Sequence, residues 1–234
     1  NSSVQSAKAH YQSATANATA LEKQLVDALS CRFQKPYAVS GEEFDRWDDD
    51  YASAMRRVYY NFKDDHDVAA LFAEALITRT AWKLWNVNTG EPTAGAHTIE
   101  ALEVIERSIA SNSAADRQQH PAILHLHIHV TEMSNEPERA RESADRLSTM
   151  CPDAGHMNHM PGHTYLLCGE YELAKLASEK AIRADDIYVD YAGPYNFYTT
   201  ARAHDLHLMM FTCMFLGQYA PALNAAESIC KTIT

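Results

Sequence analysis

Imidazole side chains recur at helical spacing in three separate stretches of this sequence, and one of these stretches adds a carboxylate. Spacings of three, four and seven residues place the side chains of each stretch on one face of a helix. A helix face that gathers imidazoles is a ready chelating surface for a metal ion. The residues are His125, His129 and Glu132 in the first stretch, His156, His159 and His163 in the second, and His204 and His207 in the third.

The residue types predict which metals could bind. Two histidine pairs with a spacing of four residues, His125–His129 and His159–His163, could together complete a four-ligand site, and His204 is the next candidate ligand. Nitrogen donors without thiolates favour Zn, Cu, Fe, Ni or Mn ions over Ca or Mg ions. The sequence therefore predicts a bound transition metal ion and leaves its identity and number open.

There are more candidate ligands than the four that one tetrahedral site needs. Either two metals bind, or some of these side chains hydrogen-bond to the ligands without touching the metal. Glu132, His156 and His207 are the candidates for an extra ligand or a supporting contact. Glu132 is also the candidate general base, acting on a water molecule whose pKa the metal lowers. Pro161 lies inside the predicted helix of the second stretch, where it removes a backbone donor. Such exceptions to local rules tend to collect at functional sites.

An internal repeat determines the predicted architecture. A shift of 34 residues superimposes the two histidine pairs. The second copy also carries Gly162, Tyr165 and Ala174 at the spacing of a tetratricopeptide hairpin, in which small residues let two helices pack closely. The sequence thus predicts helix–turn–helix repeats.

A third repeat follows an insertion. The pattern Gly-x-Tyr-x-x-Ala that starts at Gly169 recurs at Gly217, 48 residues later, so 14 extra residues intervene. We place them at about 187–200, a stretch with five aromatic residues. Two interpretations stay open: an aromatic-packed connector between repeats, or a flap over the groove that brings a tyrosine of this stretch near the histidines. The candidate tyrosines are Tyr191, Tyr195 and Tyr198.

We therefore expect an all-α protein, a right-handed superhelical solenoid of tetratricopeptide-like repeats. Residues 1–118 are expected to form diverged N-terminal helical hairpins, and residues 119–234 the three repeats. Because the first helices of such repeats line the concave surface of the stack, the histidines should point into its groove. In the N-terminal part, amphipathic periodicity predicts helices at 20–30, 51–62, 67–78 and 98–110.

The histidine stretches also resemble a large group of microbial tetratricopeptide-repeat proteins. The run HPAILHLHIHVTEMSNEPERA, followed by PDAGHMNHMPGHTY, is similar to that group's pattern of His-Pro-Gly, His, Ile-His and Glu, then Pro-Asp-Ala-Gly-His and His-Met-Pro-x-His. This sequence has Ala122 where glycine is usual and Gly162 where serine is usual. The resemblance, from about Leu21 onward, implies the repeat fold and little chemistry. Members usually carry more repeats before this segment, which implies that the chain is part of a longer protein.

The composition of the chain indicates which partners and which cellular compartments are compatible with it. A net charge of −11 argues against nucleic acid, which requires a basic surface. No window reaches the roughly 18 consecutive apolar residues of a membrane helix, so we expect no membrane span. Five widely spaced cysteines favour a reducing, cytoplasmic compartment, whereas the sequons at Asn1 and Asn17 fit a secreted protein. The start at Asn1 without a methionine indicates a processed chain or a fragment.

Two functions are consistent with these patterns. The first is a metal-binding tetratricopeptide-like protein, with a hydrolase or an oxidoreductase as its enzymatic forms. The alternative is a non-catalytic scaffold that binds a peptide, or another copy of itself, along the groove of the solenoid. The histidine and glutamate set, which is not mixed with lysine, arginine or asparagine, favours the first.

Overall fold

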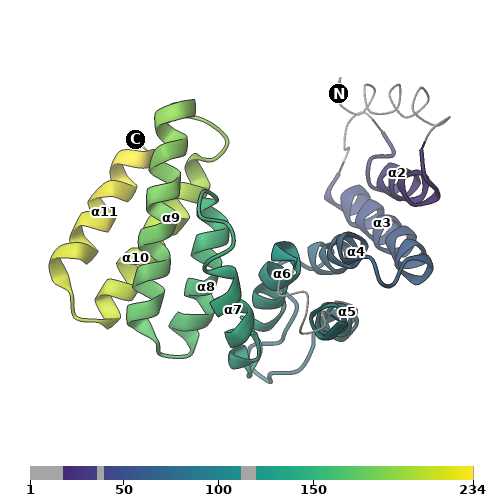
Figure 1. The fold of residues 1–234 in the computed structure, drawn as a ribbon, viewed down its shortest axis with the longest axis horizontal. Coiled ribbons are helices and arrows are strands. Elements are labelled where there is room, and N and C mark those ends of the chain that lie inside the picture. The colour runs from purple at the N-terminus through teal and green to yellow at the C-terminus, as the bar shows by residue number, and fades with distance from the viewer. Residues whose placement is uncertain (1–17, 36–39, 112–119, 234) are drawn as a thin grey trace. The chain divides into compact units, whose positions relative to one another are not determined.

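The computed structural model describes residues 18–35, 40–111 and 120–233, and all the regular elements in these segments are helices (Figure 1). The prediction of an all-α protein is confirmed. The chain divides into two compact units, residues 1–123 and 124–234, which are described separately below. The sequons at Asn1 and Asn17, together with His10, lie outside the described residues.

The first unit consists of helices that pack in chain order. Neighbouring helices contact one another from α2 to α5. Their core is built on Trp47, Met55 and Phe72, which are at most 2% exposed. The helices are α2 (Ala20–Arg32), α3 (Gly41–Asn61), α4 (His66–Thr78) and α5 (Thr98–Ser111).

Helix starts in this unit follow local capping rules. Thr19 and Glu22 form a capping box at α2, in which each side chain satisfies a backbone N–H of the other residue. Ser40 and Asp65 cap α3 and α4, each through one side-chain oxygen that accepts a hydrogen bond from a backbone N–H of the first turn. The four helices predicted from periodicity are all present, and α3 begins at Gly41, ahead of the amphipathic stretch at 51–62.

The second unit carries the histidine stretches. Helix α6 (Pro121–Thr131) begins just before this unit and is followed by the short η1 (Pro137–Ala140) and α7 (Arg141–Leu147). Helix α8 (Gly155–Leu167) packs against α9 (Tyr171–Ala192) and also contacts α7 and α10 (Thr199–Phe215). Helix α10 in turn packs against α9 and α11 (Tyr219–Ile233), as Figure 1 shows in green and yellow.

The same turn joins the helices of both hairpins, α8–α9 and α10–α11. Gly169 and Gly217 have φ angles of 76° and 68°, a left-handed conformation that glycine adopts without a steric penalty. After Gly169 the Glu170 N–H donates to the Tyr165 carbonyl at 2.8 Å, and after Gly217 the Gln218 N–H donates to the Cys213 carbonyl at 2.8 Å. These are equivalent bonds of the Schellman motif, so the repeated sequence pattern corresponds to a repeated turn.

Small residues let α8 approach its neighbours closely. A Cβ atom at Gly162 would lie 2.8 Å from Cδ2 of Leu208 on α10 and 3.5 Å from Cβ of Ala177 on α9. Ala174 is completely buried in the same interface. This close contact holds the histidine-bearing faces of α8 and α10 next to each other.

The predicted insertion at 187–200 is largely helical. Helix α9 continues to Ala192, so only a short connector precedes α10. At least one of three tyrosines is expected near the histidines, and two of them, Tyr191 and Tyr195, are 89% and 73% exposed. Tyr198 alone turns inward, and its hydroxyl accepts a hydrogen bond from the backbone N–H of His156. One tyrosine of the stretch therefore does lie beside a histidine, as expected.

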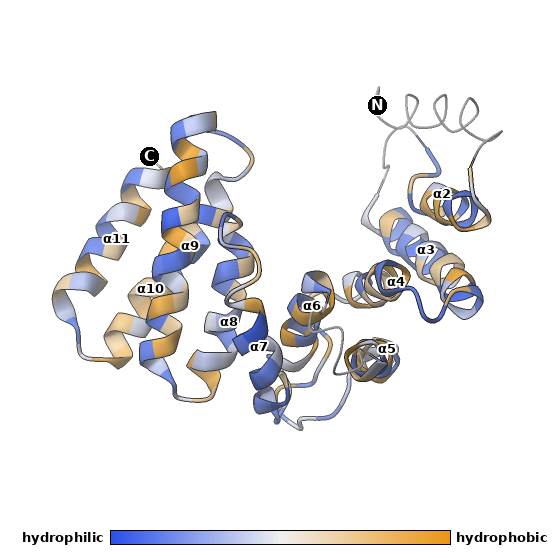
Figure 2. Cartoon of the chain, viewed as in Figure 1, coloured by the Kyte–Doolittle hydropathy of each residue, from blue (hydrophilic) through white to orange (hydrophobic). Residues whose placement is uncertain are grey.

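Polar residues interrupt the apolar ones along the helices. Figure 2 shows hydrophilic and hydrophobic residues alternating along α9 and α11. Among the described residues, no helix combines the length and the apolar character that crossing a bilayer demands.

Candidate metal centre

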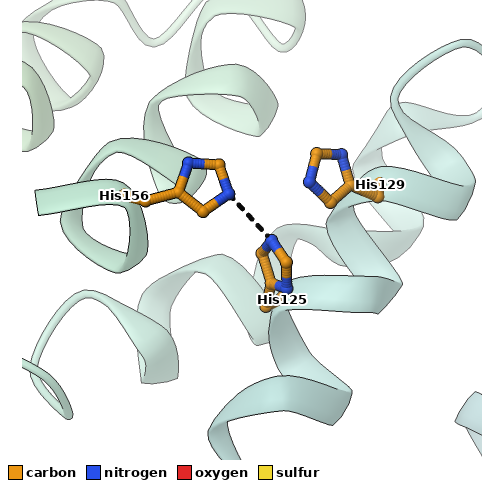
Figure 3. A group of neighbouring side chains, drawn as sticks. All are labelled: His125, His129 and His156. Carbon is orange, nitrogen blue, oxygen red and sulfur yellow. Dashed lines mark hydrogen bonds between the residues drawn. The ribbon is translucent and has the colours of Figure 1, made fainter. Parts of the chain in front are cut away.

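The first histidine triad consists of His125 and His129 from α6 and His156 from the first turn of α8. One ring nitrogen from each residue lies within 4.8 Å of those of the other two. The Nε2 atoms of His125 and His156 are 3.0 Å apart, and Figure 3 shows the three rings turned toward one another. The spacing of four residues places the two α6 histidines on one face, and α8 supplies the third ring.

The second triad consists of His159 and His163 from α8 and His204 from α10. Its ligand atoms also lie within 4.8 Å of one another, and the Nε2 atoms of His159 and His163 are 2.7 Å apart. His159 is completely buried and His204 is exposed. This triad therefore has a buried side and a side open to solvent.

The nitrogen separations suit a shared metal ion. At a metal–nitrogen distance of about 2.0–2.1 Å, two ligand nitrogens are about 3.0 Å apart at a right angle and about 3.4 Å apart in a tetrahedron. The two Nε2 pairs, at 3.0 Å and 2.7 Å, are close to this range. Small ring rotations would be enough to accommodate an ion in either triad.

In three of the six imidazoles a carboxylate lies close to the Nδ1 atom. Glu132 on the turn after α6 lies between the triads, with Oε1 3.0 Å from Nδ1 of His129 and Oε2 2.8 Å from Nδ1 of His163. Asp205 on α10 has Oδ1 3.0 Å from Nδ1 of His159. The His129–Glu132 contact has hydrogen-bond geometry, whereas the other two are ion-pair distances. A carboxylate beside Nδ1 favours the proton on that atom and leaves the Nε2 lone pair free for a metal, an arrangement typical of metal-binding histidines.

Burial keeps the imidazoles in the neutral form that binds metal. Burial and the neighbouring histidines lower the pKa of His125 to about 3 and that of His156 to about 4. The same causes hold the pKa of His159 well below its usual value and lower the pKa of His204. These rings are therefore neutral at pH 7 without having to release protons first.

Glu132 is ionised in this setting. Its burial raises the pKa, but the close contacts with His129 and His163 outweigh burial and lower the pKa to about 2. Because both carboxylate oxygens face Nδ1 atoms, Glu132 is placed to orient two ligands. This geometry favours a positioning role over that of the general base.

The turn that leads into α8 is fixed by close contacts. The Asn158 side-chain amide donates to the carbonyls of Cys151, Pro152 and Ala154 at 3.0–3.1 Å. A Cβ atom at Gly155 would lie 1.9 Å from Oδ1 of Asp185, so only glycine fits there. Pro161 lies within α8 as expected and is buried.

The structure groups the candidate ligands differently from the sequence prediction. His156, expected as a supporting residue or extra ligand, stands in the first triad beside His125 and His129. The two chelating pairs fall in different triads. His156 from α8 joins the pair on α6, and His204 from α10 joins the pair on α8. His207 lies in neither triad; its ring packs against Phe211 with centroids 4.8 Å apart.

Two buried aspartates near the histidines are not indicated by any pattern in the sequence. Asp185 on α9 and Asp205 on α10 are each 1% exposed. Burial, followed by the charge of Asp205, raises the pKa of Asp185 to about 8, and burial raises the pKa of Asp205 to about 6. The positions of these aspartates in the sequence do not predict that they meet, because their contact depends on how α9 and α10 pack.

Several other histidines serve the local structure. His127 Nδ1 lies 2.8 Å from the Ser143 hydroxyl in a buried contact. In the first unit, His66 Nδ1 lies 2.7 Å from the Ser108 hydroxyl. His127 therefore has an ordinary polar contact and takes no part in either triad.

Comparisons of the chain with protein-family models, with curated proteins and with solved structures find no match. The resemblance to tetratricopeptide-repeat proteins stays a prediction.

Proposed function

We propose that this protein binds two transition metal ions, one in each histidine triad. The observation that carries the proposal is the set of carboxylates behind the imidazoles: Glu132 faces His129 and His163, and Asp205 faces His159. Structural histidines need no such orientation of the opposite ring nitrogen, whereas metal ligands usually have it.

The ligand count favours a reactive centre over a structural one. Structural zinc sites are closed by four protein ligands, whereas catalytic sites have three and keep a position for water or substrate. Each triad offers three imidazoles, and His204 lies on an exposed side. In this proposal the protein is a metalloenzyme, and each of its two metal ions keeps one open coordination position.

The proposed setting is a tetratricopeptide-like repeat stack. All six triad histidines come from α6, α8 and α10, the first helices of the three predicted repeats. The equivalent turns at Gly169 and Gly217 support the same repeat. In such a stack the first helices line the groove, where a substrate has access.

Metal analysis of the protein purified without a histidine tag tests the proposal. We expect two equivalents of Zn or another first-row metal per chain by elemental analysis. His125→Ala/His129→Ala and His163→Ala/His204→Ala should each remove one equivalent. The control His207→Ala, which changes a histidine near the second triad but outside it, should retain both.

Protein without stoichiometric metal, before and after incubation with these ions, would overturn the proposal. The non-catalytic scaffold would then be the better hypothesis, and peptide binding along α6, α8 and α10 its test.

A further inference from the structure

A pocket of about 330 Å³ opens beside the first triad, between the start of α8, the last turns of α9 and the connector to α10. This volume lies within the range of small-molecule sites. His156 is one of the lining residues. The ring that completes the first triad therefore also forms part of the wall of the pocket.

Three aromatic rings line the pocket. Tyr188, Phe197 and Tyr198 line it. The rings of Tyr188 and Tyr198 are 5.3 Å apart at 71°, and those of Phe197 and Tyr198 are 6.3 Å apart at 78°. Aromatic rings set at steep angles around a space present electron-rich faces to a cation.

Carboxyl groups also line the pocket. Asp185 lines the pocket and is 1% exposed, and neither of its oxygens makes a hydrogen bond of good geometry within the described residues. Asp205, also buried, is its neighbour. Asp153 adds an exposed carboxylate at the rim.

Positive charge is scarce around this space. The described lining residues include no lysine or arginine. Arg202, the nearby guanidinium, is paired with Asp186 at 2.6 Å. Two adjacent buried carboxyl groups can both be ionised only when a counter-charge lies beside them, and a cation in the pocket would supply one.

We infer that this pocket binds a small organic ammonium ion, with aromatic rings around its apolar part and the carboxyl group of Asp185 at its charge. The inference that this ion is the substrate of the metal centre rests on the proposed function, because it depends on His156 holding a metal. Binding of the ion itself does not.

Calorimetric titration of the 234-residue chain with two matched pairs of compounds tests the inference. Choline is compared with 3,3-dimethylbutan-1-ol, which has the same shape without the charge, and butylammonium is compared with butan-1-ol. We expect saturable binding of at least one cation, at least tenfold tighter than that of its neutral partner. Equal binding of the neutral partners, or no saturable binding of either cation, overturns the inference.

Variants locate the site. Tyr188→Leu and Asp185→Asn should each weaken cation binding at least tenfold. The controls are Tyr191→Leu and Asp190→Asn, which change exposed residues of the same helix outside the pocket and should leave binding unchanged. Unchanged binding in folded Tyr188→Leu and Asp185→Asn protein, verified by circular dichroism, places the cation elsewhere and overturns the inference.

The titrations are run on metal-loaded and on chelator-treated protein, with metal content measured in parallel. Two bound metals without cation binding overturn only the pocket inference. Cation binding by protein that takes up no metal supports the pocket and overturns the proposed function.

Discussion

The Nδ1 atom of His159 lies 3.0 Å from Oδ1 of Asp205, and both side chains are almost completely buried, at 0% and 1% exposure. They come from different helices, α8 and α10, so their contact ties the second triad to the packing of these helices. A carboxylate beside Nδ1 of a buried imidazole favours the tautomer with the proton on that atom, which leaves the Nε2 lone pair for a metal.

Asp205→Asn should weaken metal binding in the second triad by about 10–100-fold, the usual effect of losing a carboxylate behind a metal-bound histidine. The amide keeps the size of the side chain but removes the negative charge. Competition titration with a chromophoric chelator measures the affinity. Asp190→Asn, an exposed aspartate on α9, is the control. An unchanged affinity would exclude a positioning role for Asp205.

Glu132→Gln should weaken both metal sites, because Glu132 faces one histidine of each triad. Glutamine has a single acceptor oxygen, so it cannot accept from both Nδ1 atoms. His125→Ala should affect the first site alone. Cobalt(II) titration followed by visible absorption resolves the two steps. A loss confined to one site in Glu132→Gln would show that the carboxylate does not link the triads.

Chelator treatment at pH 7 should lower the melting temperature. A metal that binds only the folded chain stabilises it by about 4 kcal/mol when the free metal is a thousandfold above Kd. Replacing ligands in both triads, as in His129→Ala/His163→Ala, should greatly reduce this sensitivity, whereas His66→Ala in the first unit should preserve it. Identical melting curves with and without chelator would contradict a metal-stabilised fold.

Asp185→Asn should stabilise the metal-free protein at pH 7–8. Burial raises the pKa of Asp185 from 3.8 to about 8, so between these values the folded state holds a proton that the unfolded state has released. Stability from this group is complete below pH 3.8 and decreases by up to about 1.4 kcal/mol per pH unit as the pH rises toward 8. Asparagine does not titrate.

Urea unfolding of wild type and Asp185→Asn at several pH values measures this difference. The comparison between the two proteins isolates Asp185 from the histidines, whose lowered pKa values act in the opposite direction below about pH 6.5. A constant difference in the free energy of unfolding from pH 5 to pH 8 would contradict the raised pKa.

Gly155→Ala should destabilise the protein by about 1–3 kcal/mol, the usual cost of forcing extra volume into a packed site. Its Cβ atom would overlap Oδ1 of Asp185 at 1.9 Å and crowd the Tyr198 hydroxyl at 2.7 Å. Gly41→Ala, where a Cβ meets nothing within 4 Å, is the matched control. Thermal unfolding measures both, and equal melting temperatures would mean that the start of α8 moves without cost.

The sequence by itself determined the helices and the residues that share a face on each of them. Helical periodicity is local, so apolar spacing predicted α2, α4 and α5 to within a few residues. The spacing within α6 and within α8 likewise identified His125 with His129, and His159 with His163, as neighbours.

The tertiary structure decided how these faces combine. Whether His156 belongs to the first triad, and His204 to the second, depends on the rotation and shift of one helix against another, which no spacing along the chain encodes. The same packing sets Glu132 between the triads and Asp185 beside Asp205. Periodicity arises from bonds within a helix, whereas these contacts arise from side-chain volumes such as the missing Cβ of Gly162, which brings α8 against α10.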